Sequence, residues 1–113
     1  MLAATYRFHG RRSLGFLFRQ GRSVRRKSVS LKYTINLRRQ GFRCAVVVGK
    51  KVSKISPVRN RIRRRIYEVV RLHAQDVPSG ADMAFFVYDA SVADMPAAEL
   101  EATIVGLLRE VVS

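Results

Sequence analysis

The residues of this sequence that are best suited to chemistry are cationic, and they gather between Lys50 and His73. This stretch, KKVSKISPVRNRIRRRIYEVVRLH, holds nine Lys or Arg residues and one acid, Glu68. Guanidinium groups form paired hydrogen bonds with phosphate oxygens and stack on bases, and each neutralised phosphate releases counterions. A fold does not need such a cluster, because like charges repel. The stretch therefore predicts a surface that binds a polyanion.

Residues that usually carry catalysis are not grouped in the sequence. General acid–base and metal chemistry need clustered carboxylates or His and Cys ligands. His9 and His73 have no carboxylate or thiol at motif spacing, and we interpret His73 as a core histidine and Asp82 and Asp89 as turn residues. The sequence has no Gly-rich phosphate loop and no Ser/His/Asp set. We therefore expect no catalytic residue and no metal ligand in the polypeptide, and predict a binding subunit.

The charge distribution points to nucleic acid first and to an anionic membrane surface second. The net charge is +14, with a balance of +20 over residues 1–75 and −6 over residues 76–113. The first two thirds therefore build the basic face, and the acidic remainder mostly completes the core. A length of 113 residues with 48% hydrophobic content predicts a single domain, residues 1–113.

The cysteine content and the hydropathy favour a cytoplasmic protein. Cys44 is the single cysteine and lies in an apolar run, so we expect a buried, reduced thiol. No stretch reaches the roughly 18–20 apolar residues of a membrane span. The first five residues are too few for a signal peptide before the charges begin. We expect no membrane partner.

The basic cluster must be positioned by a helix predicted over residues 57–74. Pro57 suits the first turn of this helix, and Ser56 is the expected N-cap. At 100° per residue one arc of the helix is apolar: Val58, Ile62, Ile66, Val69, Val70 and His73. The residues on the opposite side are polar or cationic: Asn60, Arg61, Arg64, Tyr67, Glu68 and Arg71. Three further arginines flank this side: Arg59, Arg63 and Arg65.

The other elements are predicted from the same kinds of pattern. A short helix is expected over residues 12–20, an alternating strand region over 22–39, a central strand over 42–48, a strand over 83–88 and a last helix over 96–112. The strand region could hold one strand or two. This order of elements predicts an α+β sandwich in which helices cover a small sheet.

A second candidate site lies beside the first helix. In the strand region Ser30, Lys32 and Thr34 share one polar face, and the helix before it carries Phe16 and Phe18. Aromatic rings interleaved with basic groups suit single-stranded RNA, whose bases stack while its phosphates pair. Phe18 is as well explained as a core residue, whereas Phe16 is expected to be exposed.

At Arg59-Asn60-Arg61 the sequence resembles the protein subunit of bacterial ribonuclease P. The resemblance covers nearly the whole chain, and a lysine pair followed by Arg-Asn-Arg after an apolar strand is quite specific. The matching residues are Arg7-Phe8, Leu17 to Arg22, Ala45 to Val48, Lys50-Lys51-Val52, Arg59 to Arg64, and Asp82 at the start of the later strand. Arg65 stands where the family has an apolar residue, and Tyr88-Asp89 where a basic residue is usual.

The resemblance implies a fold and a function. The fold would be a single two-layer α+β sandwich of order αβββαβα with a left-handed βαβ crossover, against the usual right-handed rule. The chain would bind the catalytic RNA, with a stoichiometry of 1:1, and the single-stranded 5′ leader of precursor tRNA. The RNA, with the Mg²⁺ that the holoenzyme requires, would hydrolyse the phosphodiester to leave the mature tRNA 5′ end. The polypeptide would bind no cofactor and be inactive without the RNA.

The resemblance and the helical phase together give two sets of site residues. The set expected to bind the RNA subunit is Lys50, Lys51, Arg59, Asn60, Arg61, Arg63, Arg64 and Arg71. The set expected to line the cleft for the 5′ leader is Leu14, Phe18, Ser30, Lys32 and Tyr33. The strand register leaves open which of Lys32 and Tyr33 faces the leader.

Two other functions fit the charge. A ribosomal or ribosome-assembly protein of similar fold would share the basic surface and would co-purify with ribosomal subunits. A protein that binds anionic membranes is the third interpretation. The basic helix fits membranes poorly, because its apolar side is expected to face the core.

Overall fold

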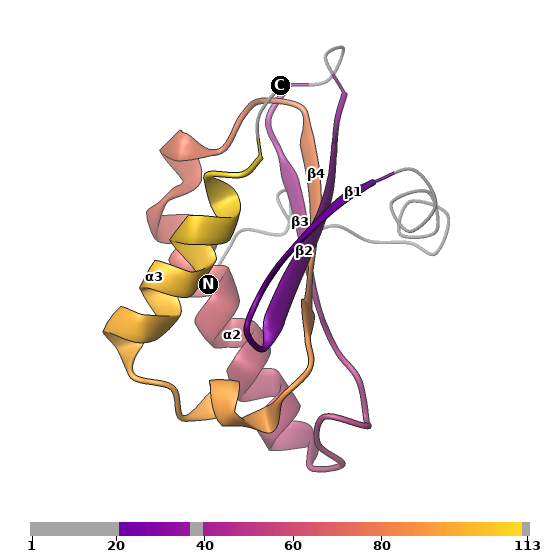
Figure 1. The fold of residues 1–113 in the computed structure, drawn as a ribbon, viewed down its shortest axis with the longest axis vertical. Coiled ribbons are helices and arrows are strands. Elements are labelled where there is room, and N and C mark those ends of the chain that lie inside the picture. Colours follow the sequence, from indigo (N-terminus) through magenta and orange to yellow (C-terminus); the bar gives the residue numbers. More distant parts are fainter. Residues whose placement is uncertain (1–20, 37–39, 112–113) are drawn as a thin grey trace.

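One mixed sheet with two long helices on one of its faces forms the fold (Figure 1). The computed structural model describes residues 21–36 and 40–111. Its elements are β1 (Arg22–Arg26), β2 (Val29–Ile35), β3 (Arg43–Val48), α2 (Ser56–Leu72), η2 (Ala74–Asp76), β4 (Ala81–Val87), η3 (Ala90–Ala93) and α3 (Ala97–Leu108). The sheet order is β1-β2-β4-β3. The predicted α+β sandwich is therefore confirmed, and the helix expected over residues 12–20 lies outside the described residues.

The predicted strand region is a hairpin of two strands, β1 and β2. Lys27 and Ser28 form the tight turn between them, and Lys27 has a φ of 51°. A positive φ at a loop residue matches the twist of short hairpins. The antiparallel register places Arg25 opposite Ser30 and Ser23 opposite Lys32.

The helix α2 is the crossover between two parallel neighbouring strands. β3 runs parallel to β4, with Val46 opposite Phe85, and α2 joins the end of β3 to the start of β4. β2 pairs with the other edge of β4 in the antiparallel sense. This is the βαβ unit that the resemblance implies, and it places the basic helix against the sheet.

The core lies between the sheet and the helices, and the predicted apolar arc of α2 is largely confirmed. Ile62, Ile66, Val69 and Val70 are buried, and Val58 packs at the edge of the core. The sheet contributes every second side chain of β2 and the side chains of β3 and β4 that point to the same face. The buried residues from these strands are Val29, Leu31, Tyr33, Cys44, Val46, Val48, Ala81, Met83, Phe85 and Val87. Cys44 is a free cysteine buried in the core, as predicted, and burial raises the pKa of its thiol.

The placement of Tyr67 on the outer side of α2 was wrong. Its side chain is 8% exposed, and its hydroxyl accepts a hydrogen bond of 3.1 Å from the backbone N–H of Val46. In the described part of the sheet β3 has β4 as its one strand neighbour, so its other edge offers backbone groups that need partners. A tyrosine satisfies such a group while burying its ring, which a period count cannot reveal.

The helix boundaries differ from the predictions by one to four residues. The N-cap of α2 is Ile55, and Ser56 is its first residue. α2 ends at Leu72, and α3 runs from Ala97 and ends at Leu108. The expected core role of His73 was wrong, because its side chain is 25% exposed and its Nε2 lies 3.1 Å from Oε1 of Glu101.

Candidate RNA-binding surfaces

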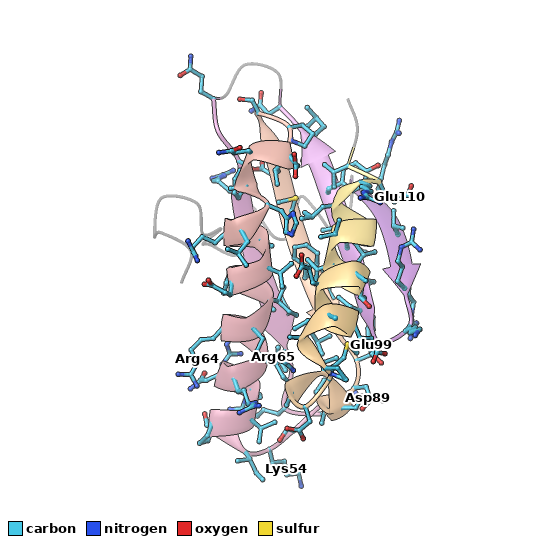
Figure 2. All side chains as sticks on the ribbon, turned by 90° about the vertical axis from the view of Figure 1, so that its left-hand side faces the viewer. Lys54, Arg64, Arg65, Asp89, Glu99 and Glu110 are labelled. Carbon is cyan, nitrogen blue, oxygen red and sulfur yellow. The ribbon has the colours of Figure 1, made fainter. Side chains whose placement is uncertain are left out.

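The outer side of α2 carries two arginines that form no salt bridge within the described residues, the exposed Arg64 and the half-buried Arg63. Arg64 is exposed and has no hydrogen-bond or ion-pair partner among residues 21–36 and 40–111, and Figure 2 shows it on the outer side of the helix. In the preceding residue, Arg63, Nη2 donates to Oδ1 of Asn60, one turn earlier in the helix, at 2.5 Å. Neither guanidinium forms an ion pair within the described residues, so both charges remain available to an anion.

Arg59 ties the start of α2 to the loop that precedes it. Its Nη1 donates to the backbone carbonyl of Ser53 at 2.8 Å, and its Nη2 donates to Oγ of Ser56 at 3.1 Å. The exposed pair Lys50 and Lys51 lies in the same loop. The guanidinium of Arg59 therefore fixes the loop that carries the lysine pair relative to the helix.

Arg61 and Arg65 hold the segment between β4 and α3. Nε of Arg61 donates to the carbonyl of Ala93 at 2.8 Å, and its side chain stays 58% exposed. Nη1 of Arg65 donates to the carbonyls of Val92 at 2.7 Å and Ala93 at 2.9 Å, and its Nη2 bonds the carbonyl of Met95. Figure 2 shows Arg65 on the side of α2 that faces α3. Arg65 therefore acts as a clamp, because its hydrogen bonds hold this segment against α2. Arg61 also bonds the segment, but most of its side chain stays exposed.

Arg71 is paired with the acid of the same helix. Both its Nε and its Nη2 donate to the carboxylate of Glu68, one turn earlier. This hydrogen bonding lowers the pKa of Glu68 to about 2, so the carboxylate is charged throughout the physiological range. The positive charge of Arg71 is locally compensated, unlike that of Arg64.

The structure places all eight predicted RNA-subunit residues on α2 or on the loop before it. It also separates them by role. Lys50, Lys51, Arg63 and Arg64 present charges without an acid partner in the described chain. The remaining four side chains form hydrogen bonds within the protein: Arg59, Asn60, Arg61 and Arg71.

The other face of the sheet, opposite α2 and α3, holds the second candidate site. We call it the second face. The registers place these side chains on it: Ser23, Arg25, Ser30, Lys32, Thr34, Arg43, Ala45, Val47, Asp82, Ala84 and Phe86. Lys32 belongs to this face, whereas Tyr33 points into the helix-covered core, where its hydroxyl donates to the carbonyl of Glu110 at 2.8 Å. The register therefore places Lys32, and not Tyr33, on the second face. Leu14 and Phe18 lie outside the described residues.

Ser30 is buried, which excludes it as an open contact residue of the second face. Its side chain is 3% exposed, and its Oγ lies 2.7 Å from the hydroxyl of Tyr88. Tyr88 itself follows β4 and is 51% exposed. The guanidinium carbon of Arg25 lies 4.4 Å from the centroid of the Tyr88 ring. Sequence reasoning missed this group, because strands far apart in the chain bring its members together.

Arg43 and Asp82 form a bidentate salt bridge on the second face. Nε and Nη2 of Arg43 lie 3.0 and 3.1 Å from the two carboxylate oxygens of Asp82, whose side chain is 12% exposed. The interpretation of Asp82 as a turn residue was wrong, because it lies within β4. Asp89 is a turn residue as predicted, since its Oδ1 accepts from the N–H of Ser91 at the start of η3.

Two kinds of feature are absent from the part of the chain that the structure describes. Among the described residues no group of three or more His, Cys, Asp or Glu side chains is placed to hold a metal ion. In the same part of the chain no helix is long and apolar enough to cross a membrane. A sheet backed by a cationic helix and carrying a second basic face defines the class: a small α+β protein built to bind RNA.

Within that class the chain belongs to the ribonuclease P protein family. The family model for ribonuclease P matches residues 2–112. The ribonuclease P protein component of Chloroflexus aggregans is 35% identical over 96 residues, which cover 82% of this chain and 70% of that protein. The corresponding protein of Roseiflexus castenholzii is 38% identical over 72 residues, covering 64% of this chain and 58% of its own length.

Solved structures show the same fold at lower identity. The ribonuclease P protein of Thermotoga maritima superimposes with a TM-score of 0.82 at 20% identity, covering 95% of this chain and 98% of that one. The Staphylococcus aureus protein gives 0.81 at 21% identity, covering 93% and 94%. Membership of this family implies association with the ribonuclease P RNA.

Proposed function

We propose that this chain is the protein component of a ribonuclease P holoenzyme and docks on the RNA subunit through α2 and the preceding loop. The observation that carries the proposal is the separation of arginines on α2. Arg59, Arg61 and Arg65 fix the helix to its surroundings, while Arg63 and Arg64 project charges that no acid of the described chain neutralises. A rigid helix with uncompensated guanidinium groups binds phosphates without first breaking internal ion pairs.

The second face is the proposed site for the single-stranded 5′ leader of precursor tRNA. Lys32 supplies a cation on this face, and the half-buried Val47 supplies apolar surface beside it, whereas Phe86 is buried. Leu14 and Phe18 remain predicted contributors from the preceding segment. Leader and RNA subunit would thus be bound by opposite sides of the β3–α2–β4 unit, so one small protein could contact both.

The chemistry of cleavage is assigned to the RNA subunit. Mg²⁺ bound by that RNA would activate the hydrolytic step and stabilise the leaving oxygen. The chain's own contribution would be affinity for the precursor and a lower demand for cations, because its arginines neutralise phosphates that metal ions otherwise screen. A complex of one protein with one RNA in the cytoplasm completes the proposal.

The RNA that co-purifies with the full chain tests this function against the ribosomal alternative. We expect affinity purification of the native protein, followed by sequencing of the bound small RNAs, to recover ribonuclease P RNA as the main species. Recovery of ribosomal RNA with ribosomal subunits, and no ribonuclease P RNA, would favour the ribosomal alternative and overturn the proposal.

A further inference from the structure

The end of the second face near the β1–β2 turn carries an exposed aromatic group that the proposed docking surface does not use. Tyr88 is one of the large side chains that stay more than half exposed, at 51%. Its hydroxyl is anchored by Ser30 at 2.7 Å, and its backbone N–H donates to the carbonyl of Ser28 at 2.8 Å. Both ends of the residue are therefore fixed, which lowers the entropy lost when a ligand stacks on the ring.

Arg25 completes this group. Its guanidinium lies over the Tyr88 ring, 4.4 Å from the centroid, and its Nε lies 3.3 Å from the carbonyl of Lys27. The neighbouring cations of the hairpin behave differently. Arg26 pairs with Glu110 at 3.5 Å and Lys27 with Glu99 at 3.7 Å, both on the α3 side of the sheet (Figure 2). Arg25 is held by a ring and a carbonyl, so its charge is not neutralised by these contacts.

We propose that Tyr88 and Arg25 form a stacking site for one unpaired nucleotide of the bound RNA. Aromatic rings and guanidinium planes are the two protein surfaces on which single-stranded bases stack, and here one supports the other. The base would stack on the exposed surface of the pair, and the charge of Arg25 would attract the adjoining phosphate. The inference rests on the proposed function, since the nucleotide would belong to the 5′ leader that runs along the second face.

The site would tolerate different bases. A stacked base presents its face, and not its edge, to Tyr88 and Arg25, and every base has a stacking face. Its contribution would therefore be to affinity and to the path of the strand, with no strong sequence preference. Ser30, which is too buried to touch RNA, would act by positioning the ring.

An abasic scan of the leader tests the site. The reconstituted complex of the full chain with ribonuclease P RNA is titrated with precursor tRNAs that lack the base at one leader position each. With the wild-type chain, we expect one position to weaken binding by between about 5-fold and about 100-fold. Tyr88→Ala should weaken binding of the intact precursor by a similar factor and abolish the effect of that position. Tyr88→Phe, which keeps the ring but loses the hydrogen bond to Ser30, should keep the effect of that position and weaken binding less than Tyr88→Ala does.

Arg25→Lys separates stacking from charge. It keeps the cation but loses the guanidinium plane, so the salt dependence should stay unchanged while the effect of the abasic position shrinks. Tyr88→Ala with wild-type affinity and an unchanged abasic profile would overturn the stacking site. Direct binding of ribonuclease P RNA by each variant is the control. If the wild-type chain did not bind ribonuclease P RNA, the proposed function would be contradicted. If it bound that RNA but no abasic position of the leader weakened binding of the precursor, only the stacking site would be contradicted.

Discussion

Arg64→Ala is expected to weaken binding of ribonuclease P RNA by about fivefold to thirtyfold, the equivalent of about 1–2 kcal/mol. Arg64 is exposed and has no partner within the described chain, so its guanidinium is free to pair with a phosphate. Loss of one phosphate contact should also reduce the slope of log K against log salt by about one unit. Equilibrium binding measured at several salt concentrations gives both quantities.

Arg71→Ala is the matched control on the same helix. Glu68 already compensates the charge of Arg71. Arg71→Ala should therefore change the RNA affinity and the salt slope much less than Arg64→Ala does. Glu68→Gln should have the opposite sign, strengthening binding, because it releases the guanidinium of Arg71. Equal salt slopes for wild type and Arg64→Ala would remove Arg64 from the interface, and a steep loss for Arg71→Ala would show that RNA displaces Glu68.

Arg65→Met is expected to cost stability and to leave the salt slope unchanged. The guanidinium of Arg65 donates to the carbonyls of Val92, Ala93 and Met95, and the substitution leaves these acceptors partly buried without their donor. We expect a loss of about 2–3 kcal/mol in the free energy of unfolding. Urea denaturation should show a lower midpoint with an unchanged m-value.

Arg64→Met provides the comparison for that experiment. Arg64 is the neighbouring residue on the exposed side, so its replacement should change stability by less than about 0.5 kcal/mol. The two variants should thus show opposite behaviour, one losing RNA affinity and the other losing stability. A chain with Arg65→Met that is as stable as the wild type would show that the clamp does not hold the segment between β4 and α3.

The helical phase of residues 57–74 was predictable, because burial on α2 follows the period of the helix. Ile62, Ile66 and Val70 lie in the core as that period requires. The phase failed at Tyr67 and could not foresee the clamp at Arg65, since both side chains are long enough to reach a backbone group beside the expected face. Period counting places a Cβ atom, and it does not place the far end of a long side chain.

The second face was only partly visible in the sequence, because strand pairing decides which residues meet on it. Alternation correctly grouped Ser30, Lys32 and Thr34, but the salt bridge of Arg43 with Asp82 joins residues 39 apart. Likewise, the contact of Ser30 with Tyr88 depends on the antiparallel pairing of β2 with β4. Local spacing carries no register information between distant strands.

Reconstitution of tRNA 5′ processing tests the central claim most directly. The full chain is added to a bacterial ribonuclease P RNA at a Mg²⁺ concentration at which the RNA cleaves precursor tRNA poorly, and leader removal is followed in time. The account predicts that the wild-type chain stimulates cleavage at the mature 5′ end and that Arg64→Ala needs a higher protein concentration for the same effect. No stimulation by the correctly folded wild-type chain would contradict the account.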